Sequence, residues 1–531
     1  MFPLLFSLFY GNVVFAASLT VHNVDTGLSY ASIQEAIDAV ETLDGHTIFV
    51  DAGVYYENVV VNKSLTLAGE DGGTTIIDGG EGLVIMVEAS NTVVKGFTIR
   101  NRYPYNGIHL YHVSGSSVYN NNIDEGNIGA KVTYSPGSRI YNNNIHSNMM
   151  GVMVLHSCRS RVFNNRITGS GVYSLAVGYS SDSSVFCNNI TDGASGLYVA
   201  GGCDISILGN NIMNMGYWGI ALENASGCTI NQNSIINSHI ALIPGSEDSF
   251  NSKIYHNNIT QNEFGIILYD DSFNNKIYHN NFVNNSKNVE SYNQTSMWDD
   301  GYPSGGNYWS DYNETDLYCG PIQNETGSDG IGDTPYIIDE NNMDMYPLME
   351  PYSWVNVLAV ERVRLERTTL CQGLTTKIDV DIINCGRFTE TFNLTLYINT
   401  TVFDKTEVTL VSIDATTLTY TWDTAGFAKG NYTIRATATP VQGEIEVLDN
   451  TCTCWAIVSM VGDLTGADSW PDGEVDMRDI GVAARAFGSY PGHDRWNLEA
   501  DITGPEYLVP DNDVDMRDIA LIARHFGETD P

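Results

Sequence analysis

The chain contains 531 residues, with 25 Lys and Arg against 64 Asp and Glu, which gives a formal net charge of −39 at pH 7. Only 17% of the residues are charged, while 43% are apolar and 50 are glycine; this composition excludes a disordered chain and a helical bundle and favours a β-rich protein of several domains. Nucleic acid is excluded as a partner, because so few basic side chains cannot build the positive stripe that phosphate backbones require.

The first 17 residues are predicted to be a signal peptide. Residues 2–15 are largely apolar, and the small pair Ala16-Ala17 follows at the expected cleavage position. An N-terminal anchor is the alternative, because no Lys or Arg precedes the apolar stretch. No later segment approaches the ~20 apolar residues that span a bilayer. We therefore expect a secreted or cell-surface protein with no membrane span after signal removal.

From about residue 92 the chain repeats a short pattern in which a β-branched residue is followed by an aromatic or apolar residue, Asn-rich positions and a closing apolar residue. The closing apolar residue recurs at 123, 145, 167, 190, 212, 235, 259 and 282. A second segment with alternating apolar residues follows in most repeats, for example Gly151–Val154. Alternation predicts strands, and such a period predicts a solenoid of stacked coils. The fold expected is a parallel β-helix in a mainly β protein.

One Asn stands two places before the closing residue in all eight repeats. These residues are Asn121, Asn143, Asn165, Asn188, Asn210, Asn233, Asn257 and Asn280. Asn tolerates left-handed turns, and its amide is able to donate to one neighbouring coil and accept from the other. We interpret these residues as a structural ladder without catalytic meaning.

The repeats resemble those of right-handed parallel β-helix proteins described as carbohydrate-binding and sugar-hydrolysis domains, including pectin-lyase-like proteins. The segment from Ser32 is similar to the N-terminal capping helix of that superfamily, and Ile33, Ala36, Ile37 and Val40 fall on one helical face. Residues 306–312 and 329–336 are similar to the closing motif of periplasmic and archaeal members. The predicted boundaries are 18–286 for the β-helix and 287–354 for its C-terminal cap.

Catalysis on the β-helix would require clustered carboxylates on adjacent coils. The hydrolase motifs of pectinolytic β-helix enzymes are absent from this chain. The weak catalytic candidates are Asp270 and Asp271, with Asp248, His256 and His279 nearby. The alternative is a solvated turn, because adjacent strand residues point to opposite faces.

An outward column of aromatic residues is the candidate carbohydrate-binding surface, because sugar rings stack on flat aromatic rings. Its members are Tyr119, Tyr141, Phe163, Phe186, Tyr255 and Tyr278. Stacking that only stabilises successive coils is the alternative. His109, His112, His146 and His156 do not share one ladder position, so that no common metal site is expected.

Residues 355–458 alternate in longer segments such as 377–384 and 417–422, which predicts antiparallel strands of a β-sandwich. The segments 383–386 and 430–433 resemble immunoglobulin-like adhesion modules of bacterial and archaeal surface proteins. Such a module implies a spacer or a binding unit.

Residues 459–531 contain a duplication with an offset of 39, in which Asp-Met-Arg-Asp-Ile occurs at 476–480 and again at 515–519. This duplication closely resembles a dockerin, a small α-helical module with two loop-helix halves of EF-hand type. The resemblance implies Ca²⁺ as cofactor and a cohesin-like protein partner that faces Met477-Arg478 and Met516-Arg517. The implied ligands are Asp463, Thr465, Asp472, Glu474, Asp476 and Asp479 in the first copy, and Asp501, Thr503, Asp511, Asp513, Asp515 and Asp518 in the second.

Three functions follow from these features. The leading hypothesis is an exported cell-surface or secreted β-helix protein that binds polysaccharide or glycoconjugate and is attached through the calcium-dependent dockerin-like module. The first alternative is a glycoside hydrolase or polysaccharide lyase of the same architecture. The second alternative is a structural adhesin or surface-layer component.

Overall fold

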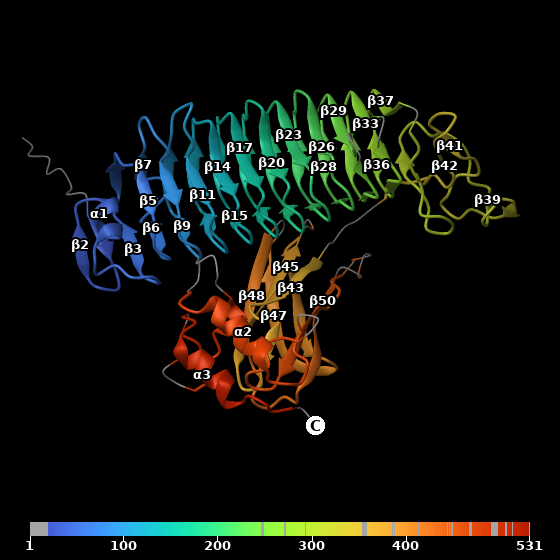
Figure 1. Ribbon diagram of the computed structural model, residues 1–531. Coiled ribbons are helices and arrows are strands. Elements are labelled where there is room, and N and C mark those ends of the chain that lie inside the picture. Colours follow the sequence, from blue (N-terminus) through green and yellow to red (C-terminus); the bar gives the residue numbers. More distant parts are fainter. Residues whose placement is uncertain are drawn as a thin grey trace, which may run out of the picture.

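The computed structural model describes residues 20–529 except 246–248, 270–271, 293, 353–357, 385, 387, 412–413, 443, 445–446, 448–449, 467–469, 490–496, 505–506 and 512. The predicted signal peptide lies outside the described residues. Figure 1 shows a long solenoid with a second body of strands and helices beneath its middle. Among the described residues, the chain is mainly β with three α-helices, which are α1 (Ile33–Asp38), α2 (Met477–Ala486) and α3 (Met516–Arg524).

The solenoid is a parallel β-helix that contains three sheets, and a typical coil adds one strand to each of them. The first sheet contains β1 (Val21–Asn23), β2 (Leu28–Tyr30), β3 (Thr47–Val50), β6 (Thr66–Gly69), β9 (Val93–Lys95), β12 (Ser117–Tyr119), β15 (Arg139–Tyr141), β18 (Arg161–Phe163), β21 (Ser184–Phe186), β24 (Ser206–Leu208), β27 (Thr229–Asn231), β31 (Lys253–Tyr255) and β35 (Lys276–Tyr278). The second contains β4 (Gly53–Tyr55), β7 (Thr75–Asp78), β10 (Thr98–Arg100), β13 (Asn122–Asp124), β16 (Asn144–His146), β19 (Arg166–Thr168), β22 (Asn189–Thr191), β25 (Asn211–Met213), β28 (Ser234–Ile236), β32 (Asn258–Thr260), β36 (Asn281–Val283) and β38 (Tyr308–Trp309). The third contains β5 (Val59–Val61), β8 (Ile85–Val87), β11 (Ile108–Tyr111), β14 (Ile128–Thr133), β17 (Met150–Leu155), β20 (Tyr173–Gly178), β23 (Ser195–Ala200), β26 (Trp218–Glu223), β29 (Ile240–Ile243), β33 (Phe264–Leu268) and β37 (Lys287–Ser291).

Three further pairs of short strands belong to the same part of the chain. They are β30 (Ser249–Phe250) with β34 (Ser272–Phe273), β39 (Tyr318–Cys319) with β40 (Glu325–Thr326), and β41 (Tyr336–Ile337) with β42 (Met343–Asp344).

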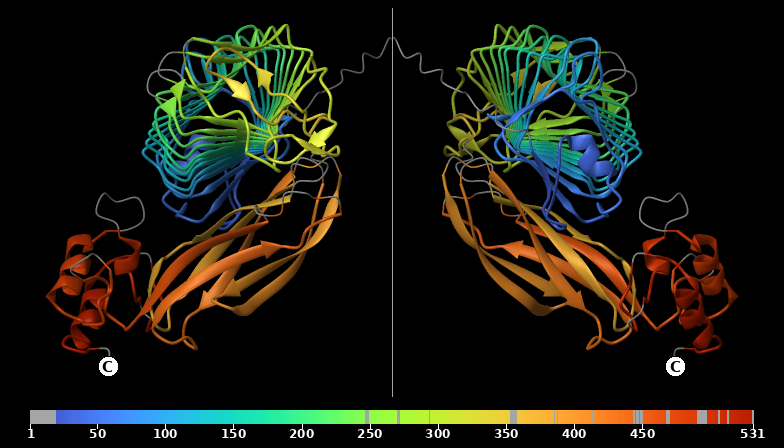
Figure 2. Two further views of the ribbon diagram at one scale, coloured as in Figure 1. Left: turned by 90° about the vertical axis from the view of Figure 1, so that its right-hand side faces the viewer. Right: turned by 90° about the vertical axis from the view of Figure 1, so that its left-hand side faces the viewer.

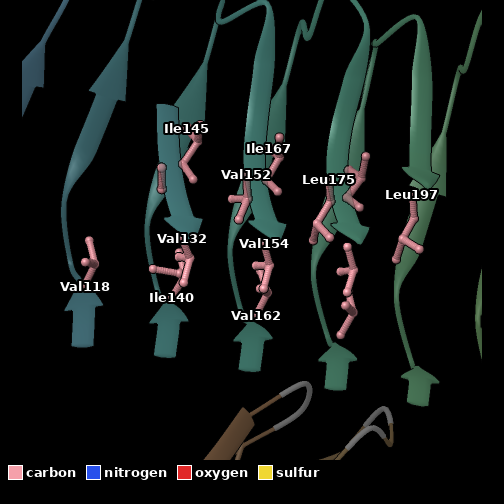
Figure 3. Packing of buried hydrophobic residues seen from close by; sticks show 14 of the residues in the cluster. Val118, Val132, Ile140, Ile145, Val152, Val154, Val162, Ile167, Leu175 and Leu197 are labelled. Carbon is pink, nitrogen blue, oxygen red and sulfur yellow. The ribbon is translucent and has the colours of Figure 1, made fainter. Parts of the chain in front are cut away.

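The predicted repeat register is confirmed. The closing apolar residues pair coil to coil in the second sheet, as in Ile123 with Ile145 and Ile145 with Ile167. Figure 3 shows Ile145 and Ile167 with Val118, Ile140 and Val162 filling the interior of adjacent coils. Helix α1 buries Ile33, Ala36 and Ile37 as expected. Val40 does not join them: the helix ends at Asp38, and the side chain of Val40 is 84% exposed.

The Asn ladder runs through the coils as a chain of amide hydrogen bonds. The Oδ1 of each member accepts the backbone N–H of the preceding one at 2.9 to 3.1 Å. The ladder continues one coil beyond the predicted eight, to Asn307. There Asp344 takes the place of the next Asn, because its Oδ2 accepts the backbone N–H of Asn307 at 2.7 Å. Burial raises the pKa of Asp344 to about 7. The motif at 306–312 therefore closes the ladder.

The second body contains two sheets. The three-stranded sheet contains β43 (Leu358–Leu365), β45 (Thr375–Asn384) and β48 (Asp414–Asp423), and the five-stranded sheet contains β44 (Thr369–Cys371), β50 (Thr451–Ser459), β49 (Gly430–Ala438), β46 (Glu390–Ile398) and β47 (Thr401–Leu410). One hydrophobic core includes residues from both sheets, such as Leu370 and Trp422, and from the C-terminal helices, such as Ala483 and Ile522. The strands and helices therefore form one packed unit, which lies below the solenoid in both views of Figure 2.

This unit is docked on the outer side of the first sheet. Phe186 and Leu208 pack against Ala359 and Ile383 in a small apolar cluster. Beside it, the guanidinium of Arg161 forms an ion pair with the carboxylate of Asp381, and both side chains are buried. None of the helices among the described residues is long and apolar enough to cross a membrane.

Candidate functional site

A column of four rings lies exposed along one edge of the β-helix. The ring centroids of His112 and Tyr134 are 4.8 Å apart, those of Tyr134 and His156 4.9 Å, and those of His156 and Tyr179 5.1 Å. The successive interplanar angles are 20°, 7° and 9°, so that the rings are stacked nearly parallel. We call this set the exposed column.

The backbone places these four rings at one position of successive coils. Each residue directly follows a strand of the third sheet and adopts a positive φ of 49° to 55°. The next residue belongs to a buried ladder: Ser135 Oγ accepts the N–H of Val113 at 3.1 Å, and Ser157 Oγ accepts that of Ser135 at 2.9 Å. The ladder holds the turn in register, and the positive φ turns the aromatic side chain outward.

The exposed column has a large accessible surface. Tyr134 is 48% exposed and Tyr179 is 58% exposed. In the next coil, Gly201 occupies the same position, and a Cβ there would lie 2.8 Å from the ring of Tyr179. A side chain at position 201 would thus clash with the ring of Tyr179, and glycine avoids this clash.

This column was not predicted from the sequence, although its signal is present there. His112 and His156 do share a ladder position, contrary to our expectation, and Tyr134 and Tyr179 alternate with them at spacings of 22 and 23 residues. A search for one repeated residue type does not detect an alternating column.

The predicted carbohydrate-binding column is stacked but partly covered. Tyr119, Tyr141, Phe163 and Phe186 stack at centroid distances of 4.6 to 4.7 Å. Phe186 is 2% exposed and, with the half-buried Phe163, contacts the docked sheets. Leu208 and Asn231 occupy the next two positions and separate this stack from Tyr255 and Tyr278, whose centroids are 5.3 Å apart. The docked unit therefore covers the ring of Phe186, so that a sugar has no access to it.

Of the weak catalytic candidates, Asp248, Asp270 and Asp271 lie outside the described residues. His256 and His279 are buried and stack on each other and on Tyr352, with centroid distances of 4.4 to 5.5 Å. Burial and, to a smaller extent, the charge of the neighbouring His279 together lower the pKa of His256 to about 3. These histidines thus stand in an aromatic stack that is closed to solvent.

The first acidic repeat is arranged around Arg478. Its guanidinium lies 3.0 Å from Asp472 Oδ2 and 2.7 Å from Asp476 Oδ2. Asp479 accepts the backbone N–H groups of Leu464 and Thr465 at 2.8 and 2.9 Å and thereby joins the loop to the start of α2. These carboxylates are satisfied by the chain itself.

Asp463 is the exception in this repeat. Its side chain is buried, and its Oδ1 has no hydrogen-bond partner among the described residues. Burial, with the carboxylates of Asp479 and Asp472 nearby, raises the pKa of Asp463 to about 7. A cation beside Asp463 would relieve this cost.

The second repeat follows the same plan. Arg517 contacts Asp511 at 2.8 Å and also pairs with Asp515, while Asp518 accepts the N–H groups of Ile502 and Thr503. Asp511 Oδ1 is buried without a described partner. Asp501 is buried next to Arg367, at 3.8 Å between Oδ2 and Nη2.

The remaining predicted ligands are the half-buried Thr465, the buried Thr503, and the exposed Glu474 and Asp513. The donor types match what calcium prefers. However, no group of three or more His, Cys, Asp or Glu side chains in the described part of the chain is placed to hold a metal ion. In this arrangement Arg478 and Arg517 pair with four of the carboxylates that calcium would bind, which are Asp472, Asp476, Asp511 and Asp515.

The stacked coils, the polar ladders and the aromatic columns define a parallel β-helix protein with a docked C-terminal unit. The family described as "Periplasmic copper-binding protein (NosD)" matches residues 42–242 and 169–314, which together cover just over half of the chain. The chain belongs to this family.

In the described part of the chain, neither histidine stack fits a copper centre, and no group of three or more His, Cys, Asp or Glu side chains is placed to hold a metal ion. Copper sites need nitrogen or sulfur ligands that converge on one point. In the exposed column, Tyr134 separates His112 from His156. The parallel rings of His256 and His279, inclined by 2°, face each other and do not converge.

A "Cell surface glycoprotein" of Methanothermus fervidus is 40% identical over 110 residues, which is 20% of this chain and 18% of that protein. The chain thus matches less than a fifth of the length of this curated relative.

Solved structures similar to this chain have lower identity. The A-module of the Azotobacter vinelandii mannuronan C-5 epimerase is 16% identical, with coverage of 50% of this chain and 93% of the module and a TM-score of 0.41. The catalytic unit of a GH87 α-1,3-glucanase of Streptomyces thermodiastaticus is 16% identical, with coverage of 51% and 61% and a TM-score of 0.36. A CARDB domain of Pyrococcus furiosus, solved in complex with di-metal ions, is 22% identical, with coverage of 20% and 96% and a TM-score of 0.18.

Proposed function

We propose that this protein is an envelope or cell-surface β-helix protein that binds polysaccharide along the exposed column. The single observation that carries the proposal is the stack His112, Tyr134, His156 and Tyr179, with half or more of the surface of Tyr179 open to solvent. Pyranose rings present apolar faces that pack on aromatic rings, and a rigid row of such rings binds with little loss of side-chain entropy.

The location is supported by two relatives. The family model is described as periplasmic, and the curated relative is called a cell-surface glycoprotein. Both descriptions agree with the predicted signal peptide at residues 1–17, which would deliver the chain outside the cytoplasm.

The experiment is native affinity electrophoresis of the full chain through gels that contain a panel of polysaccharides. Tyr134→Ala with Tyr179→Ala should weaken retention about tenfold, because each stacked ring contributes roughly 0.5–1.5 kcal/mol. Tyr56→Ala is the matched control, because Tyr56 is 79% exposed and lies outside the column. Equal retention of the double variant and the wild type would refute the proposal.

The same samples test the enzyme alternative. New reducing ends or unsaturated products would replace a binding function with polysaccharide cleavage, and attention would then turn to Asp248, Asp270 and Asp271. Absence of retention on every polysaccharide would favour a structural surface component.

We further propose that the C-terminal repeats bind Ca²⁺ and attach the protein to a cohesin-like partner. The buried, partnerless Oδ1 atoms of Asp463 and Asp511 support the first part, because buried carboxylates without partners are costly. Calcium would be held by the acidic residues of each loop after the arginine side chain moves away. The exposed side chains of Met477 and Met516, at 66% and 61%, support a docking face.

The test is a thermal melt of the full chain with calcium or with a chelator, followed by capture on an immobilised cohesin module. We expect calcium to raise the melting temperature and to permit capture. A melt that does not respond to calcium, with Asp463→Asn identical to the wild type, would refute the calcium site.

A further inference from the structure

A cleft between the β-helix and the docked unit gathers positive charge. Its volume is about 530 Å³, and five of its lining side chains are basic. They are Arg139, Arg159, Arg362, Arg364 and Lys377. The whole chain contains only 25 Lys and Arg against 64 Asp and Glu, so that one fifth of all its basic residues line this single cleft.

The acidic groups of the cleft do not balance this charge. Asp379 and Glu366 are the acidic side chains in its lining. Asp379 is shared by Arg364, at 2.6 Å, and Arg139, at 3.8 Å. Among the described residues, no carboxylate lies within ion-pair distance of Arg159 or Lys377. The lining therefore carries a surplus of positive charge.

Crowding of the cations is visible at Arg139. Burial lowers the pKa of Arg139, and the nearby guanidinium groups of Arg364 and Arg161 lower it further, against the opposing effect of Asp381 and Asp379. Burial and mutual repulsion disfavour the charged forms of these side chains, and an anion that enters the cleft would stabilise them.

Docking of the two bodies uses only part of this positive charge. Arg139 pairs with Asp379, and Arg362 donates to the carbonyl oxygen of Asp182, across the same junction that holds the apolar cluster around Phe186 and the buried ion pair of Arg161. Arg159 and Lys377 are exposed and contribute to none of these contacts. A net positive surface between two domains opposes their approach unless an anion is present.

The cleft lies next to the exposed column. Its β-helix side includes Ser114, Pro136 and Arg159, which follow the column residues His112, Tyr134 and His156 by two or three positions in the same turns. At Gly115 and Gly137 the lining has no side chain. A chain that stacks on the column would therefore run beside the basic groups.

We propose that this cleft binds the carboxylate or sulfate groups of an acidic polysaccharide. The inference rests on the proposed glycan binding by the exposed column and specifies the chemistry of the glycan. The guanidinium of arginine is able to donate two parallel N–H groups to two oxygens of one carboxylate or sulfate group. The partly enclosed cleft strengthens these charge interactions.

The test is affinity electrophoresis of the full chain with matched pairs of polysaccharides: polygalacturonate against its methyl ester, and dextran sulfate against dextran. The variant is Arg159→Gln with Lys377→Gln. The control is Lys253→Gln with Lys405→Gln, which removes the same charge at exposed positions outside the cleft. Melting temperatures equal to that of the wild type show that the variants fold.

We expect tighter retention by the acidic member of at least one pair, with retention that falls as salt is added. The cleft variant should lose about tenfold in affinity for that acidic chain, while the control keeps most of it. Which pair responds separates carboxylate from sulfate recognition. Equal retention of acidic and neutral chains, or equal losses in variant and control, would overturn the inference. Equally tight retention by duplex DNA would also overturn it, because the cleft would then be a general polyanion site.

The two proposals fail in different ways. If the double variant Tyr134→Ala with Tyr179→Ala loses retention and the cleft variant does not, the proposal of glycan binding by the exposed column is supported and the anionic cleft is refuted. The reverse result supports an anionic cleft and refutes stacking on the column.

Discussion

The β-helix and the docked C-terminal unit satisfy their buried polar groups in opposite ways. In the β-helix, Asn165 bonds to Asn143 and Asn188, its equivalents in the two adjacent coils. In the C-terminal unit, the buried Arg367 donates to the carbonyl oxygen of Asp501, which is 134 residues away along the chain. Repetition therefore makes each polar contact of the β-helix predictable from the period of the sequence, whereas the C-terminal unit depends on pairs of residues that no sequence period predicts.

The largest effect is expected at a central rung of the ladder. Asn165→Ala removes the acceptor of the Asn143 amides and the donor to the Ile140 and Phe163 carbonyl oxygens. Several buried groups lose partners at roughly 1–3 kcal/mol each, so that the free energy of unfolding should fall by about 5 kcal/mol. Denaturant unfolding measures this loss. Asn144→Ala is the control, because Asn144 is half-buried and makes a 3.4 Å bond to Asn122. Similar losses in both variants would contradict the ladder.

The next effect concerns the junction of the two regions. Arg161→Met leaves the carboxylate of Asp381 buried without its ion-pair partner, which costs about 3–5 kcal/mol. We expect the C-terminal unit to undock, and small-angle scattering would record a larger maximum dimension. Arg161→Met with Asp381→Leu should restore docking. Arg100→Gln is the control, because Arg100 is partly exposed and its pair with Asp78 lies in the second sheet of the β-helix. Undocking in this control would contradict the assignment.

A smaller, pH-dependent effect is expected where the ladder ends. The pKa of Asp344 is raised to about 7, so its protonated form is favoured by folding; the stability it confers is present at low pH and is lost as pH rises toward and through about 7. Between about pH 4 and 7 the loss is at most about 4 kcal/mol. Asp344→Asn should be as stable as the wild type near pH 4 and more stable near pH 8 in thermal melts. Parallel pH profiles would show that Asp344 does not titrate in this range.

The smallest effect concerns Arg478 and the proposed calcium site. Arg478→Gln releases Asp472 and Asp476 from the guanidinium. Removal of these exposed ion pairs should tighten calcium binding roughly fivefold in titration calorimetry. Arg485→Gln, later on the same helix, should leave the affinity unchanged. Weaker binding in Arg478→Gln would instead assign Arg478 a supporting role in the loop.

Much of the β-helix could be predicted from the sequence, because its period repeats the same local environment. The register of Ile123, Ile145 and Ile167 and the Asn ladder follow from spacing alone. The covering of Phe186 could not be predicted in this way, because it depends on contact with Ile383, almost 200 residues away along the chain. The ion pairs of the acidic repeats could likewise not be predicted from the spacing of the residues. Arg478 pairs with Asp472 and Asp476, which are carboxylates that the loop pattern assigns to calcium.

The ladder that ends at Asp344 also bears on how such a protein changes length. Every rung gives and receives the same bonds, so that gene duplication or deletion of one complete coil would join equivalent rungs and leave no amide orphaned. Loss of half a coil would bring unlike residues together inside the solenoid. Length variation among natural forms of this protein should therefore occur in steps of whole coils, with the two ends of the solenoid retained.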